Sequence, residues 1–191
     1  IHNMKELCEL FTLDRVSKGG AVFNHKKLMW YNEHYIRETS ADELLPRIKE
    51  LAENAGFDTK DDEYLKTVVG LLHERVSKIE EFVAMGSFFF EAPKEYDENA
   101  LKKWKDDSAG LVTAYKEKIA GLSDADFEAA TLKSKLEETI AEHEVGFGKL
   151  MMPLRIVVTG QGFGPDLFQS LELLGKEEVL DRIDVALEKL G

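Results

Sequence analysis

Residues 151–175 read MMPLRIVVTGQGFGPDLFQSLELLG, and this stretch decides the fold class of the chain. Taken by itself, the β-branched run at 156–159, followed by three glycines, looks like a strand that enters a phosphate-binding loop. Such a loop needs a parallel sheet of alternating strands and helices, and the 191 residues contain no second candidate strand. Pro165 and Asp166 also occupy the positions where a phosphate loop carries Gly and Lys. We therefore reject the nucleotide-binding interpretation.

The remainder of the chain has helical periodicity almost throughout. Apolar residues recur every three or four positions, most regularly over 61–84, where one long amphipathic helix is predicted. The predicted helices cover 4–11, 24–37, 41–55, 61–84, 98–106, 109–120, 131–143, 165–174 and 176–190. The chain is therefore predicted to be all-α, with two packed helical bundle subdomains, at 1–93 and 94–191.

The amino-acid composition limits the classes of ligand that the chain could bind. The chain carries 37 acidic and 25 basic residues, for a net charge of −12. This balance argues against a general DNA or RNA binder, because nonspecific affinity depends on neutralising phosphates. A site that reads unpaired bases by stacking and hydrogen bonding is still compatible with it.

Several other site classes lack their sequence signals. No apolar run reaches 18 residues and no signal-peptide pattern is present, so we expect a cytoplasmic protein without membrane contact. Cys8, the single cysteine, lies at an apolar helical position and is predicted to be core packing in a reducing compartment. The histidines lack metal-ligand spacing and no nucleophile motif occurs, so neither a metal site nor a catalytic site is predicted. The start without Met suggests a piece of a longer protein.

Two arginines are the candidate binding residues. Arg155 lies in a window, 145–165, that contains no Asp or Glu. An arginine inside an apolar run needs a partner, so either a ligand or a distant carboxylate is expected to meet it. Arg75 either pairs with a nearby acid such as Glu80 or presents its guanidinium fork to a base edge or phosphate.

Three blocks of the sequence resemble bacterial glutamyl-tRNA synthetases, in the order and at the spacing of that family. The first block lies at 11–37 and contains FTLDRVSK, AVFN and KLMWYNEHYIR. The second is the predicted helix with Leu72 and Arg75, and the third is PLRIVVTG at 153–160, followed by GPDLF and LLGKE. Together these blocks cover nearly the whole chain, which is similar to the C-terminal, anticodon-binding region of the family.

The resemblance implies a fold and a partner. The family consists of class I synthetases that use ATP and Mg²⁺ to attach glutamate to tRNA, and their catalytic motifs are absent here. This chain would then hold no cofactor and would bind the anticodon loop of tRNA, as a monomer. The resemblance also implies that residues 154–159 are helical, begun by Pro153 and ended by Gly160; an isolated strand would have nothing to pair with.

By the same resemblance, Arg75 would read the first anticodon base and favour C, and Arg155 would contact the third base. The turn of Gly164, Pro165 and Leu167 would line the middle base. Some relatives have Thr at the position of Gly164, so in this chain only backbone groups could make that contact.

Two alternatives stay open. One is a free-standing acidic helical domain that binds other proteins, whose charge serves solubility. The other is the same region of a non-discriminating synthetase that also charges glutamine tRNA, against which Arg75 argues.

Overall fold

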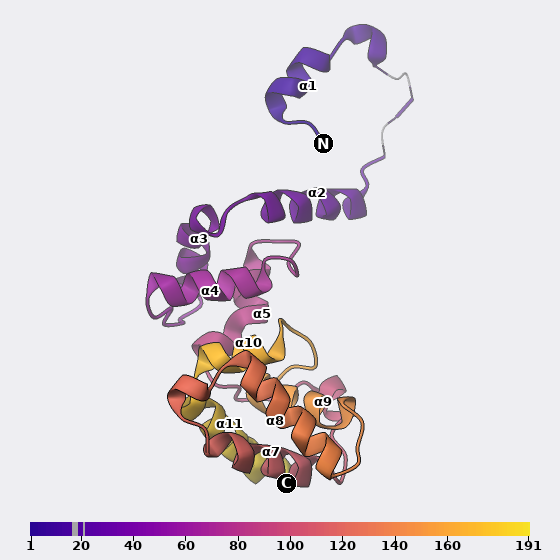
Figure 1. The fold of residues 1–191 in the computed structure, drawn as a ribbon. Helices are drawn as coiled ribbons and strands as arrows, with labels where there is room; N and C mark the ends of the chain where they lie inside the picture. The colour runs from indigo at the N-terminus through magenta and orange to yellow at the C-terminus, as the bar shows by residue number, and fades with distance from the viewer. Residues whose placement is uncertain (17–18, 21) are drawn as a thin grey trace.

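The computed structural model describes residues 1–16, 19–20 and 22–191, and these residues contain helices and no strand, which confirms the all-α prediction. The elements are α1 (Met4–Leu10), the 3-10 turn η1 (Leu13–Arg15), α2 (His25–Glu38), α3 (Ala41–Asn54), α4 (Asp62–Leu72), α5 (Glu80–Phe90), α6 (Glu98–Leu101), α7 (Ser108–Ala120), the 3-10 turn η2 (Asp124–Asp126), α8 (Ala129–Glu142), α9 (Gly148–Thr159), α10 (Leu167–Leu174) and α11 (Lys176–Leu190). Figure 1 shows α1 apart from the other helices, α2 to α5 in the middle, and α7 to α11 at the opposite end. Ser17, Lys18 and Ala21, which belong to the first block of the resemblance, lie outside the described residues.

Local capping signals set several helix ends as predicted. The side chain of Asn24 accepts a hydrogen bond from a backbone N–H of the first turn of α2. Ser40 and Glu43 form a reciprocal capping box that starts α3. The helix predicted over 98–106 is shorter than expected, because α6 ends at Leu101.

The prediction of one long helix over 61–84 is wrong, because this segment forms two helices, α4 and α5, with a turn between them. The Glu81 carboxylate accepts hydrogen bonds from the backbone N–H groups of Ser77 and Lys78, at 2.7 and 3.2 Å. Groups bonded to that side chain no longer continue the helical ladder. Val76 still fills the core at 1% exposure, so the apolar periodicity persists through the break. Arg75 therefore lies in an exposed turn rather than on a helix face.

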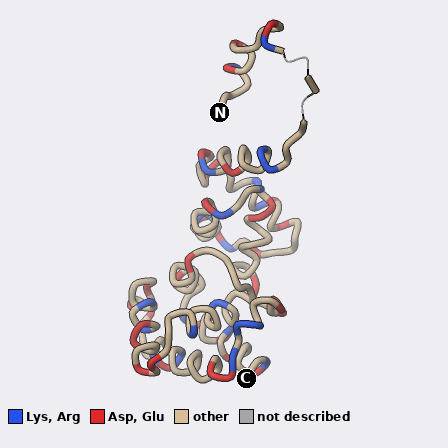
Figure 2. The backbone as a smooth tube through the Cα atoms, turned by 90° about the vertical axis from the view of Figure 1, so that its right-hand side faces the viewer, with Lys and Arg blue, Asp and Glu red and all other residues tan. Residues whose placement is uncertain are grey.

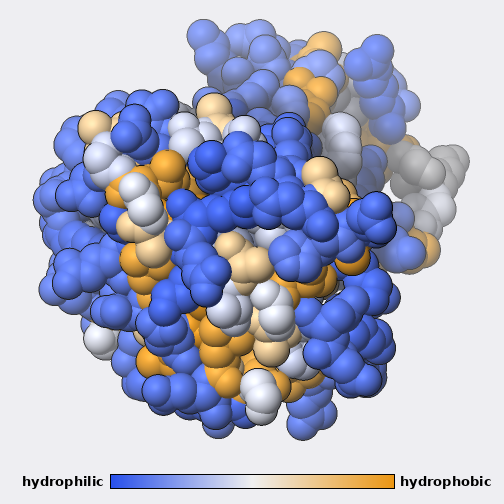
Figure 3. Space-filling model, turned by 60° about the horizontal axis from the view of Figure 1, so that its bottom comes forward, coloured by the Kyte–Doolittle hydropathy of each residue, from blue (hydrophilic) through white to orange (hydrophobic). Residues whose placement is uncertain are grey.

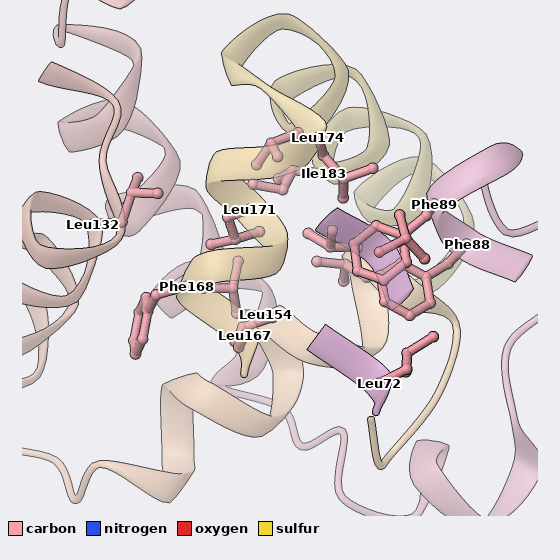
Figure 4. Close-up of a cluster of buried hydrophobic side chains, with 14 of the residues drawn as sticks. Leu72, Phe88, Phe89, Leu132, Leu154, Leu167, Phe168, Leu171, Leu174 and Ile183 are labelled. Carbon is pink, nitrogen blue, oxygen red and sulfur yellow. The ribbon is translucent and has the colours of Figure 1, made fainter. Parts of the chain in front are cut away.

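One continuous hydrophobic core joins the two halves of the chain. Figure 4 shows the apolar side chains of α10 between those of α5, among them Phe88 and Phe89, and Leu132 of α8. The boundary predicted at residue 93 therefore lies between elements that share a core. The division into subdomains at 1–93 and 94–191 stays a prediction.

Helix α9 contains the β-branched run at 156–159, for which the sequence alone favoured a strand and the family resemblance implied a helix. It is helical from Gly148 to Thr159, so the predicted start at Pro153 is wrong. Leu150 and Leu154 are fully buried, and their packing carries the helix through the proline, which forfeits one backbone hydrogen bond. The predicted stop is confirmed, because Gly160 leaves the helix with a φ of +73°.

Helix α10 begins later than predicted. The Asp166 side chain accepts a hydrogen bond from the Gln169 backbone N–H at 3.0 Å and acts as the N-cap. The first helical residue is therefore Leu167, and Pro165 belongs to the preceding turn.

Helix α1 contacts none of this core. All residues from 1 to 16 are exposed, and Cys8 is exposed with them, so its predicted core position is wrong. Helical spacing shows that Met4, Leu7 and Phe11 share a face, but it does not show what covers that face. Within the described part of the chain, nothing buries it.

Charged residues of both signs occur along both halves of the backbone in Figure 2. Many form exposed pairs, such as Lys49 with Asp62 at 2.6 Å, which contribute little to stability. Figure 3 shows one face covered mostly by hydrophilic residues, with strips of hydrophobic atoms between them. No helix formed by the described residues is long and apolar enough to cross a bilayer.

Tyr64 gives the fold a pH-dependent contribution. Its hydroxyl donates a hydrogen bond to the Phe89 carbonyl at 2.7 Å, and burial raises the pKa of the hydroxyl to about 12. Because this folded-state pKa lies above the unfolded value of 10.0, the contribution is complete below pH 10 and is lost as the pH rises through 12. We expect the free energy of unfolding to fall over this range, and Tyr64→Phe to reduce the fall. Urea unfolding of both proteins across the range measures this, and an equally steep fall in Tyr64→Phe would contradict it.

Candidate anticodon-binding site

Arg155 lies near the middle of α9 and is only 8% exposed. Its side chain makes no hydrogen bond or ion pair within the described residues, and its Nη1 atom is fully buried without a partner. A buried charge that has lost its hydration and gained no partner destabilises the fold. The guanidinium therefore has hydrogen-bond donors that no described residue uses, and its side chain also lines a cavity.

Arg182 of α11 provides the contrast. It is 4% exposed, but its Nη1 donates to the Val158 carbonyl at 2.9 Å and its Nε donates to Glu178 at 2.7 Å. This side chain ties α11 to α9 and is satisfied by the protein itself. Helix α9 therefore accepts a hydrogen bond from one buried arginine, Arg182 of α11, that has structural partners. Its own buried arginine, Arg155, has none.

Arg75 and Arg155 lie on distant segments of the sequence. In the fold, the charge of Arg75 affects the pKa of Arg155. Burial lowers the pKa of Arg155, the positive charge of Arg75 lowers it further, and Asp166 opposes both effects. Arg75 makes no ion pair with Glu80 or with any other described carboxylate, and its neighbour Glu74 pairs instead with Arg37, at 3.2 Å. Because arginine keeps its charge in proteins, two guanidinium charges and the carboxylate of Asp166 influence one another here.

The turn between α9 and α10 lies against the Arg155 side chain. Gly164 adopts a φ of +150°, and a Cβ atom built on it would lie 3.2 Å from Nη1 of Arg155. A larger residue at this position would be strained and would press on the guanidinium. The next residues of the site, Pro165 and Leu167, are buried, whereas Phe163 and Asp166 of the same turn are exposed.

A cavity of about 210 Å³ opens beside Arg155. Its lining consists of Lys133, Phe147, Met151, Arg155, Asp166, Leu167 and Phe168. Of the predicted site residues, Arg155 and Leu167 line it directly, whereas Gly164 contacts the site through Arg155 and Arg75 through its charge.

Five lining residues were not predicted to belong to the site, namely Lys133, Phe147, Met151, Asp166 and Phe168. Phe147 lies inside the acid-free window and could have been noticed there as an aromatic residue beside Arg155. Lys133 comes from α8, and only the packing of α8 against α9 and α10 brings it to the cavity. Asp166 was noted only as a departure from a phosphate loop.

A second buried polar atom without a partner among the described residues, Oε1 of Gln161, belongs to a side chain that lines another cavity. This cavity of about 280 Å³ between the segment after α5 and the end of α9 is lined by Glu91 and Glu95 but by no arginine. Within the described residues, no group of three or more His, Cys, Asp and Glu side chains could hold a metal ion. The site is therefore marked by an unpaired positive charge, Arg155, rather than by the size of its cavity.

Comparison with known proteins gives the family. The family described as "Anticodon binding domain" matches residues 27–187. Glutamate–tRNA ligases of Pelodictyon phaeoclathratiforme and Cytophaga hutchinsonii are 40% and 37% identical to this chain over its whole length, which covers 39% and 37% of those proteins. A crystal structure of a glutamate tRNA ligase from Elizabethkingia meningosepticum superposes with a TM-score of 0.88, at 35% identity over 100% of this chain and 38% of that one. The chain thus spans less than half the length of these relatives, and it belongs to the anticodon-binding domain family that glutamate–tRNA ligases contain.

Proposed function

We propose that this chain is the C-terminal tRNA-binding region of a glutamate–tRNA ligase and that it reads the anticodon loop of glutamate tRNA. The observation that carries the proposal is Arg155, a buried guanidinium whose donors have no partner in the described residues. It lies beside a cavity that opens next to the turn of Gly164, Pro165 and Leu167. The family and its relatives supply the ligand class.

The proposed mechanism is recognition of unpaired bases in the region shared by α9, α10 and the α4–α5 turn. Bases of a loop can be turned outward, so that their edges accept hydrogen bonds from arginine. Arg155 would donate to the third anticodon base, and the backbone of residues 164–167 would line the middle base. With a net charge of −12, nonspecific attraction to phosphates is weak, so base contacts must carry much of the affinity.

The remaining activity belongs to the longer protein. In a ligase of this family, ATP, Mg²⁺ and glutamate would be bound by a catalytic region outside this chain. We further propose that the protein acts in the cytoplasm, as a monomer, and binds no DNA. A filter-binding assay of this chain with glutamate tRNA and with a DNA stem–loop of the same sequence tests the assignment. Equal affinities would contradict specific RNA recognition, and no measurable binding of either would favour the alternative of a protein-binding domain.

Arg75 is proposed to favour C at the first anticodon position. We expect Arg75→Ala to lower the preference for C over U there by about 1–3 kcal/mol, because a base-edge contact is lost. The measurement compares the affinities of parent and variant for two glutamate tRNAs that differ only at that base. Arg47→Ala, which removes an exposed arginine paired with Glu50, is the matched control. An unchanged preference in Arg75→Ala would contradict the assignment.

A further inference from the structure

Two lining residues of the Arg155 cavity have no structural role that explains their exposure. Phe147 precedes the first residue of α9 and leaves 40% of its surface exposed. Lys133 of α8 has its nearest carboxylate, on Glu137, at 4.0 Å, and both side chains are 57% exposed. A pair of this kind holds the ammonium group only weakly. The cavity therefore has an aromatic ring, a weakly held ammonium group and an unpaired guanidinium along one lining.

We propose that this cavity is a subsite for one unpaired nucleotide, in which Phe147 stacks on the base and Lys133 contacts its phosphate. The inference deepens the proposed function and rests on it, because it adds two recognition residues to the Arg155 contact. Aromatic side chains are the common stacking surfaces for unpaired bases, and each such contact is sequence-tolerant because every base has a flat face. Lysine neutralises a phosphate as a point charge.

The chemistry of the lining favours a nucleotide over an acidic peptide. A peptide carboxylate would satisfy Arg155 and Lys133 but would leave the ring of Phe147 unused. A nucleotide uses all three groups, since it combines a flat ring, polar ring edges and an anionic phosphate. Within the lining, Lys133 and Arg155 outweigh the single carboxylate of Asp166 by one positive charge, which also suits an anion.

Phe147 is tested by keeping or removing the aromatic ring. The probe is the anticodon stem–loop RNA of glutamate tRNA, titrated against the whole 191-residue chain. We expect Phe147→Leu to weaken binding about 10-fold and Phe147→Tyr to bind within about twofold of the parent, since only leucine abolishes stacking. Urea unfolding of each variant controls for folding. Equal affinities of the parent and Phe147→Leu would overturn the stacking role, as would an equal loss in the tyrosine variant.

Lys133 is tested by the salt dependence of the same titration. Loss of one phosphate contact to single-stranded RNA lowers the slope of log affinity against log salt by about 0.7. We expect this change for Lys133→Gln and an unchanged slope for Phe147→Leu. Lys135→Gln is the matched control, because Lys135 lies on the same helix and is bonded to Glu138 at 2.9 Å. An unchanged slope for Lys133→Gln would overturn the phosphate contact.

The Arg155→Met variant distinguishes a failure of the nucleotide subsite from a failure of the proposed tRNA-binding function. If Arg155→Met loses affinity while Phe147→Leu and Lys133→Gln bind like the parent, the two added roles are wrong and the proposed function stands. If the chain binds a Glu-rich peptide more tightly than the stem–loop RNA, the nucleotide subsite is wrong and the acidic-peptide alternative holds. If the parent and Arg155→Met bind the RNA equally, the proposed function itself fails.

Discussion

Replacing Arg155 by Met is expected to weaken tRNA binding and to stabilise the fold at the same time. In the free chain, the guanidinium is buried without a partner, and a methionine fills similar space without an uncompensated charge. Replacement of buried charged groups by apolar residues of similar volume is often neutral or stabilising, by up to about 4 kcal/mol. In the complex, the lost base contact costs about 1–3 kcal/mol of binding free energy. Urea unfolding and filter binding measure the two effects separately.

Arg182→Met is the matched control for this prediction. Arg182 is also buried, but its donors are bonded to Val158 and Glu178. Its removal leaves the buried Val158 carbonyl without the hydrogen bond from α11, so we expect a loss of about 1–3 kcal/mol of stability. If both variants are destabilised equally, Arg155 is a structural residue with a partner, and its assignment to a ligand is wrong.

Replacing Gly160 by Ala is expected to destabilise the fold by about 2–4 kcal/mol, through backbone strain and a direct clash. Its φ of +73° is unfavourable for alanine. A Cβ atom there would lie 2.8 Å from Cβ of Pro93 and 2.9 Å from the carbonyl oxygen of Glu95. The opposing backbone cannot withdraw easily, because the Asp97 N–H donates to the Gly160 carbonyl at 2.9 Å.

Urea unfolding of Gly160→Ala measures this effect, with Gly146→Ala as the control. Gly146 has no atom within 4 Å of a built Cβ and lies in the connection that precedes α9, so its replacement should change stability by less than about 0.5 kcal/mol. Equal stability of the parent and Gly160→Ala would show that the link between residues 93–97 and the end of α9 is loose. The turn that packs against Arg155 would then not be held rigidly in place.

Local signals in the sequence predicted much of the fold. The caps at Asn24 and Ser40 depend on neighbouring residues alone and are found as expected, and the stop at Gly160, which the family resemblance implied, is found as well. The β-branched run at 156–159 was the main ambiguity, and its burial inside α9 shows tertiary packing overriding strand propensity. The absence of any second candidate strand was therefore a better guide than the residues of the run itself.

Other features depend on contacts that a sequence pattern does not reveal. The break between α4 and α5 arises because Glu81 turns its carboxylate back onto two backbone N–H groups, although the apolar spacing continues through it. Cys8 has the spacing of a core residue on a helix that nothing in the described chain covers. In the candidate site, the lack of nearby acids singled out Arg155, but Lys133 required the packing of α8 against α9.

The central claim is that the Arg155 cavity receives an anticodon nucleotide. Its most direct test is a double-mutant cycle between the protein and the RNA: the parent and Arg155→Met are each titrated with glutamate tRNA and with the same tRNA lacking the third anticodon base. The account predicts that removal of the base costs the parent about 10-fold more affinity than it costs Arg155→Met, because stacking on Phe147 is lost in both proteins and the Arg155 contact only in the parent. A loss in Arg155→Met as large as that in the parent would contradict the account.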